Sequence, residues 1–170
     1  MNEACPSFFG KYRGEVQNNL DPQGLGRIQV SVPDVLGDGT MAWAMPCLPG
    51  AGPSVGLFLV PPTGAKVWVE FERGDPDYPI WVGGYWDLGD TPAPMGPQQS
   101  FTKALVGDNF KIEVVDMPGV GTLTISLTTP AGEAKIMADA TALQLAWGQS
   151  TIKLAVDGVS INNTNLKVLP

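Results

Sequence analysis

The stretch Gly64–Trp86 constrains the fold of this 170-residue chain more than any other. In its first half, Val67, Val69 and Phe71 alternate with polar or larger residues, which is the period-two pattern of a strand with one buried face. Its second half, from residue 79, is apolar and aromatic, and its paired glycines allow a bulge where a small barrel bends. The stretch therefore predicts two strands that form the closing hairpin of a small β-barrel.

A turn separates these two strands at Gly74, Asp75 and Pro76. Glycine accepts a positive φ, aspartate bonds nearby backbone amides, and proline has no amide to give to a ladder. Asp75 and Asp77 also raise the alternative of a paired-carboxylate catalytic site. We expect a turn rather than catalysis, because both aspartates have a role in shaping the reversal.

The residues before this hairpin contain further strand-like segments. Turn clusters rich in Gly, Pro and Asn separate them. Six such segments reach to residue 86, one more than a five-stranded barrel needs, so we expect one of them to be a loop or an added edge. The four earlier segments are 8–16, 26–33, 41–47 and 56–62. Residues 1–86 are thus predicted to form one barrel domain.

Residues 87–109 have the composition of a linker, and residues 110–170 form a second unit of short alternating strands. Each strand offers only two or three apolar residues to one side, so a single chain cannot enclose a core, and three chains packed as a prism can. The residues expected in the trimer core are Leu123, Ile125, Leu127, Ile152, Leu154 and Val156.

Composition limits the chemistry. The chain has no histidine and a net charge of −7 with scattered basic residues, so we expect no metal site, no cofactor and no nucleic-acid partner. No nucleophile elbow or phosphate loop is present in the sequence, and we expect no enzyme. Cys5 and Cys47 could form a disulfide, but we expect them to be reduced and buried, as is typical of two cysteines in a non-secreted chain. The N-terminus lacks the pattern of a signal peptide, which predicts synthesis in the bacterial cytoplasm.

Two motifs resemble one known family. The opening GEVQNNLDPQGLGRIQVSVP and the hairpin VEFERGDPDYPIWVGGYW are similar to the OB-fold domain of phage baseplate spike proteins (baseplate assembly protein V) and of the related VgrG spikes. The resemblance implies an all-β chain with a five-stranded OB barrel followed by an intertwined trimeric β-helix needle. It also implies a virion location in the tail baseplate of a phage or phage-like injection system.

The same resemblance implies a mechanical function and its partners. We expect a homotrimeric central spike that pierces the target envelope on contraction. The chain begins almost directly at the barrel, so a separate hub protein is expected. Leu166, Val168 and Leu169 are expected to form a blunt end that docks a tip protein of the PAAR-repeat kind. The alternative is a trimeric OB-fold adhesin that binds carbohydrate, for which Trp43, Trp68, Trp81, Tyr85 and Trp86 are the candidate stacking residues.

Overall fold

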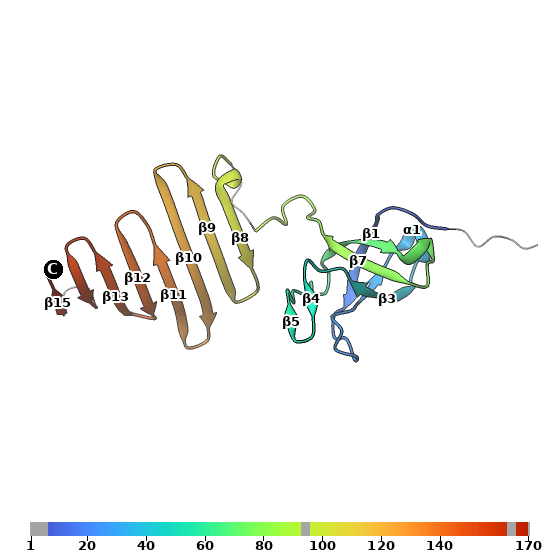
Figure 1. Ribbon diagram of the computed structural model, residues 1–170, viewed down its shortest axis with the longest axis horizontal. Coiled ribbons are helices and arrows are strands. Elements are labelled where there is room, and N and C mark those ends of the chain that lie inside the picture. The colour runs from blue at the N-terminus through green and yellow to red at the C-terminus, as the bar shows by residue number, and fades with distance from the viewer. Residues whose placement is uncertain (1–6, 93–95, 163–165, 170) are drawn as a thin grey trace, which may run out of the picture. The chain divides into compact units, whose positions relative to one another are not determined.

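The computed structural model describes residues 7–92, 96–162 and 166–169. The chain divides into two compact units, residues 1–90 and 91–170, and each is described by itself. Figure 1 labels the elements along both units.

The first unit is a closed five-stranded barrel, which confirms the predicted fold class. Its strands are β1 (Tyr12–Asn18), β2 (Ile28–Ser31), β3 (Met41–Pro46), β6 (Lys66–Phe71) and β7 (Pro79–Gly84), in the order β1-β2-β3-β7-β6. All pairs are antiparallel except β3 with β7, which run parallel.

The closing hairpin of β6 and β7 has the predicted alternation. Val67, Val69 and Phe71 are buried, with exposures of 0, 0 and 5%. The register shifts opposite Trp68, where Val82 is the extra residue of a bulge beside Gly83, whose φ is 143°. β7 also pairs with β3, through Ile80 and Trp81 before the bulge, and this pairing closes the barrel.

Short elements connect the barrel strands. They are the helix α1 (Pro33–Leu36), the two-residue strands β4 (Ala51–Gly52) and β5 (Val55–Gly56), and the 3-10 turn η1 (Glu72–Gly74). The segment 56–62 is the extra one among the six strand-like segments, because residues 57–62 form no strand. Pro61 and Pro62 have no amide hydrogen for a ladder, which explains this.

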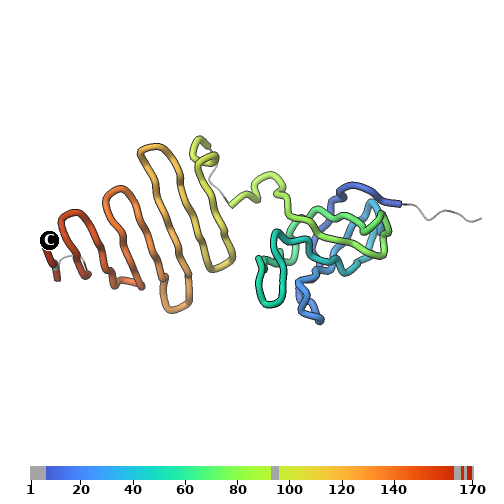
Figure 2. The backbone as a smooth tube through the Cα atoms, in the orientation of Figure 1, coloured from blue at the N-terminus to red at the C-terminus, as the bar shows by residue number. Residues whose placement is uncertain are grey.

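The second unit is one sheet of eight strands, each paired antiparallel with the next in sequence (Figures 1 and 2). After the 3-10 turn η2 (Gln99–Phe101) come β8 (Thr102–Val106), β9 (Phe110–Met117), β10 (Val120–Thr129), β11 (Gly132–Ala138), β12 (Ala142–Trp147), β13 (Ser150–Ala155), β14 (Gly158–Ile161) and β15 (Leu166–Val168).

This topology corrects one sequence-based expectation. The expected linker 87–109 contains two regular elements, η2 and β8, and β8 pairs with β9 from Thr102 to Val106. Within the described residues every strand of the sheet pairs with its neighbours in sequence, and only the outer edges of β8 and β15 lack a partner strand.

The barrel has a hydrophobic core, whereas the described part of the sheet has none. All buried hydrophobic residues of the described chain lie in the barrel: Val16, Ile28, Val30, Val32, Ala44, Val67, Val69, Phe71 and Trp81. No described residue of the second unit is buried. The barrel therefore carries its own hydrophobic core, whereas the sheet needs a partner to acquire one.

Candidate functional site: the aliphatic face of the second sheet

One face of the second sheet carries a continuous row of aliphatic side chains, one from each strand. The cross-strand register joins each member directly to the next, because antiparallel partners project to the same face. The members in strand order are Leu105, Ile112, Ile125, Ile136, Leu145, Ile152, Ile161 and Leu166. We call this set the aliphatic row.

A second row runs beside the first, two residues along each strand and on the same face. It starts with Lys103 on β8, which forms an ion pair with Asp116 at 3.5 Å. It continues through Val114, Leu123, Ala138, Leu143, Leu154, Val159 and Val168. Apart from this ion pair, the two rows together make an apolar surface along the sheet.

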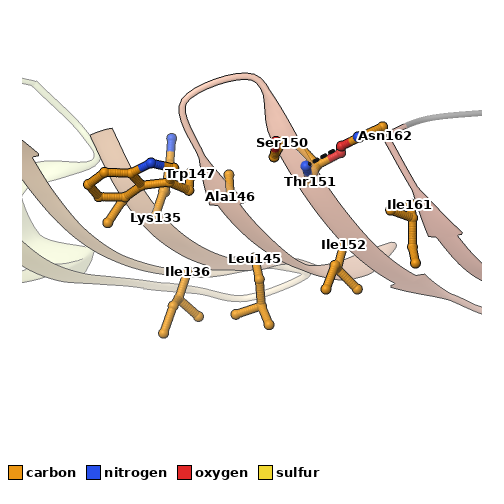
Figure 3. Close-up of a pocket in the computed structure, with 11 residues that line it drawn as sticks. Lys135, Ile136, Leu145, Ala146, Trp147, Ser150, Thr151, Ile152, Ile161 and Asn162 are labelled. Carbon is orange, nitrogen blue, oxygen red and sulfur yellow. Dashed lines mark hydrogen bonds between the residues drawn. The ribbon is translucent and has the colours of Figure 1, made fainter. Parts of the chain in front are cut away.

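The exposure of this surface is unusual for a folded protein. Ile125, Ile136 and Ile161 are each 38% exposed, and Leu166 at the last strand is 53% exposed. Figure 3 shows Ile136, Leu145 and Ile152 projecting from neighbouring strands to the same side of the sheet, where they line a shallow open groove. Contiguous apolar surface of this extent marks an interaction site.

The opposite face is mainly polar. It presents Thr124, Ser126 and an ion pair between Lys111 and Glu113 at 2.8 Å, with Val115 and Met137 among them. The sheet thus has one face suited to water and one suited to burial, as an antiparallel sheet with a covered inner face does.

The structure brings together most of the residues expected in the trimer core. Leu123, Ile125, Ile152 and Leu154 belong to the two rows, and Leu127 lies on the same face, opposite Phe110 and Ala134. Val156 does not join them, because Ala155 pairs with Gly158 and leaves Val156 in the turn, 98% exposed.

Five members of the aliphatic row were absent from the expected core: Leu105, Ile112, Ile136, Leu145 and Ile161. Their alternation was visible in the sequence, but their alignment depends on the register of each hairpin. The two-residue turns at Pro130–Ala131 and Val156–Asp157 set that register.

The expected tip residues lie at the C-terminal end of the same surface. Leu166 and Val168 are the last members of the two rows. Leu169 follows the strand and is 67% exposed. These residues continue the aliphatic face rather than forming a separate patch.

In the barrel, Gly74, Asp75 and Pro76 lie in the connection between β6 and β7. The Asp75 carboxylate accepts a hydrogen bond from the Asp77 backbone amide at 3.0 Å, and Gly74 has a φ of 79°. Arg73 also adopts a left-handed conformation, with a φ of 53°. The Asp75 carboxylate therefore shapes the turn, as the sequence predicts.

Two further aspartates fix loops. The Arg27 guanidinium, together with the backbone amides of Gln23, Leu25 and Arg27, holds the pKa of Asp21 well below its usual range. In the β11–β12 turn, the Thr141 hydroxyl and the amides of Thr141 and Ala142 lower the pKa of Asp139. Both carboxylates are engaged in local structure.

The candidate stacking aromatics are engaged within the barrel. Trp81 is buried and donates its Nε1–H to the Gly26 carbonyl at 3.3 Å. Trp68 and Tyr85 lie 4.8 Å apart between ring centroids, with the Arg13 guanidinium over both. Arg27 covers Trp43 at 5.3 Å. Trp86 alone of the five is largely exposed, at 65%, so the set offers no open platform for sugar.

Three further features of the described residues bear on function: the cysteines, possible metal-binding groups and possible membrane-spanning helices. Cys47 is a free thiol and is exposed, which corrects the expectation that it is buried; Cys5 lies outside the described residues. Among the described residues, no group of three or more acidic, cysteine or histidine side chains is placed to hold a metal ion. No helix in the described ranges has the length and hydropathy to cross a membrane.

A closed barrel joined to a sheet with one long uncovered apolar face defines a structural class, that of a β-barrel on an oligomerising β-stalk. Residues 12–86 match the family model of the Type VI secretion system/phage-baseplate injector OB domain, and residues 105–167 match that of the phage baseplate V C-terminal trimerisation domain. The chain belongs to the baseplate spike proteins of the phage baseplate V family. A comparison with curated proteins gives no significant match.

These matches confirm the resemblance seen in the sequence. They also show that the aliphatic face belongs to a trimerisation domain. Both rows lie within the trimerisation domain from residue 105 onward, apart from Lys103 just before it and Val168 just after. The family is structural, and its members are components of the tail baseplate. The apolar face therefore lies within the trimerisation domain.

Proposed function

We propose that three copies of the chain pack their aliphatic faces around a common axis to form a rigid spike. The observation that carries this proposal is the aliphatic row, which spans all eight strands while the described second unit has no buried residue. Burying the exposed part of each of these side chains contributes on the order of 1 kcal/mol per residue. Summed over two rows and three chains, this burial favours the assembled trimer over separate sheets that have no core of their own.

The sheet narrows toward the C-terminus, as Figure 1 shows. β10 has 10 residues, β13 has 6 and β15 has 3. At about 3.3 Å per residue the face falls from roughly 33 Å to roughly 10 Å in width, and eight strands about 4.8 Å apart span roughly 34 Å. Three such sheets make a tapered rod with its narrow end at β15.

The direction of the hydrogen bonds suits a mechanical load. Inter-strand hydrogen bonds run perpendicular to the strands, so in this rod they run along its axis. A force along the axis then passes through each ladder in turn, where the hydrogen bonds of the three sheets share it. We infer that the spike pierces the target cell envelope when the tail contracts.

The ends of the rod require partners. At the narrow end, the outer edge of β15 has no partner strand among the described residues, and Leu166, Val168 and Leu169 are exposed. Open strand edges and apolar ends recruit other chains. We propose that a conical PAAR-like tip protein covers them and that a separate hub protein holds the barrels, so that the chain connects hub to tip.

The molar mass in solution tests this proposal. Three copies of the 18.0 kDa chain total about 54 kDa, and light scattering of the full-length protein at micromolar concentration should give this value. A folded monomer of about 18 kDa would contradict the proposal.

A further inference from the structure

The long loop between β3 and β6 is the least charged part of the barrel surface. Residues 47–65 contain no charged residue. The rest of residues 1–90 carries eleven acidic and five basic residues, a net charge of −6 for the unit. Such a gap in an acidic surface is typical of the centre of a protein interface, where charged residues are depleted.

This loop also exposes apolar side chains. Val55 is 71%, Leu57 45%, Phe58 69% and Leu59 41% exposed. Leu25, on the neighbouring β1–β2 loop, is 51% exposed. We call these five residues the loop patch.

Close contacts join the two loops of the patch. A Cβ placed on Gly26 would lie 3.1 Å from a ring carbon of Phe58, so the ring covers this glycine closely. The Asn19 side-chain amide donates to the Pro61 carbonyl at 3.2 Å. The loop patch is thus one surface formed from two segments far apart in the sequence.

The loop has a fixed shape. The Leu57 amide donates to the Gly50 carbonyl at 3.0 Å. Gly56 has a φ of 151°, and a Cβ there would meet the Gly50 carbonyl oxygen at 2.6 Å, so only glycine fits. With this backbone conformation the apolar side chains of the loop remain exposed to solvent and are not buried in the barrel core.

We propose that the loop patches of the three barrels meet one another on the three-fold axis of the trimer. This rests on the proposed function, since the trimerisation domain is what brings the barrels together. Barrels with a net charge of −6 repel each other, and the uncharged loop patch is the surface through which they approach without facing carboxylates. Three identical patches are compatible with a closed three-fold arrangement.

Because the stalk tethers the three barrels to one another, a small patch on each barrel is enough to form the contact. Three barrels attached to one stalk have an effective concentration in the millimolar range, so each contact needs little free energy of its own. The proposed contact therefore forms in the full-length trimer and not between separate barrels.

Disulfide crosslinking in full-length protein tests this contact. In a Cys5→Ser, Cys47→Ser background, Phe58→Cys should form inter-chain disulfides on mild oxidation at a rate independent of protein concentration. Tyr78→Cys is the matched control, because Tyr78 is an aromatic residue of similar exposure, 61%, in the β6–β7 turn. We expect the residue-58 thiols to couple at least about tenfold faster, since they are held at high effective concentration. Val55→Cys gives the same readout where the residue-58 variant folds poorly.

The outcomes separate this inference from the function on which it rests. A monomeric mass by light scattering would refute the trimer itself. A trimeric mass with equal crosslinking rates at residues 58 and 78 would overturn the loop-patch contact alone. Phe58→Asp should leave a trimer whose sedimentation coefficient falls as the barrels separate, whereas Tyr78→Asp should leave it unchanged. An unchanged coefficient for both would also count against the contact.

Discussion

Asp21 and Arg27 form a two-point ion pair across the β1–β2 loop. Oδ1 of Asp21 accepts from Nε of Arg27 at 3.1 Å and from Nη2 at 2.7 Å. The Asp21 side chain is only 4% exposed, and its other oxygen accepts the amides of Leu25 at 2.8 Å and Arg27 at 3.2 Å. Asp21 therefore organises the loop that carries Leu25 and Gly26.

The first prediction concerns the pH dependence of this pair. Because the folded-state pKa of Asp21 is lowered, its contribution is fully present above the unfolded pKa of about 3.9 and is lost as the pH falls below it. Asp21→Asn should lower the melting temperature of the barrel at pH 7, and this difference should shrink below about pH 4. Circular dichroism melting between pH 2 and pH 7 measures it.

The control for this experiment is Asp38→Asn, which changes an exposed carboxylate in the loop after α1. It should leave the melting temperature nearly unchanged at each pH. An Asp21→Asn effect that is the same at pH 2 and pH 7 would show that the stabilisation does not depend on ionisation.

The second prediction tests the aliphatic row. Ile125→Asp places three carboxylates in the apolar centre of the trimer, at a cost of roughly 3 kcal/mol or more per chain from desolvation and mutual repulsion. We expect the trimer to be lost at micromolar concentration, as measured by light scattering. The adjacent change Ser126→Asp is the control, because Ser126 lies on the polar face between Lys111 and Lys135. Equal tolerance of both substitutions would exclude this face as the trimer core.

The third prediction separates the two units. A fragment of residues 1–90 retains all the buried hydrophobic residues of the described chain, so it should fold cooperatively as a monomer. Its contact through the loop patch should be absent without the tether. Circular dichroism and sedimentation of the fragment measure both properties. An unfolded fragment would mean that the barrel depends on the second unit for its stability.

The sequence predicted the barrel better than the sheet for a physical reason. The burial of Val67, Val69 and Phe71 follows from local alternation, and the bulge beside Gly83 follows from the paired glycines. Local patterns carry this information because each barrel strand has one buried face. Apolar and polar residues therefore alternate along the strand itself.

The errors arose where local pattern does not determine pairing. Lys103 occupies an apolar-face position and so hid the alternation of β8. Val156 continues the alternation of β13, but the chain turns there. The apolar run 57–62 has the composition of a buried strand, yet its prolines and its closure onto Gly50 keep it outside the barrel ladder. Each case depends on partners that are distant in sequence.

The last prediction concerns the narrow end of the spike. Deleting residues 166–170 removes β15 and exposes the edge of β14, while seven strands of each aliphatic face remain. The trimer should therefore persist, and binding of a tip protein should be lost, because the apolar residues that it would cover are gone. Co-purification of the tip protein with assembled particles measures the loss. The triple change Leu166→Ser, Val168→Ser and Leu169→Ser should act in the same way, whereas Val156→Ser, at an exposed apolar residue in the β13–β14 turn, should have no effect. If purified wild-type particles contain no additional protein at the narrow end of the spike, no tip protein is present, and the three narrow sheet ends must themselves enter the envelope.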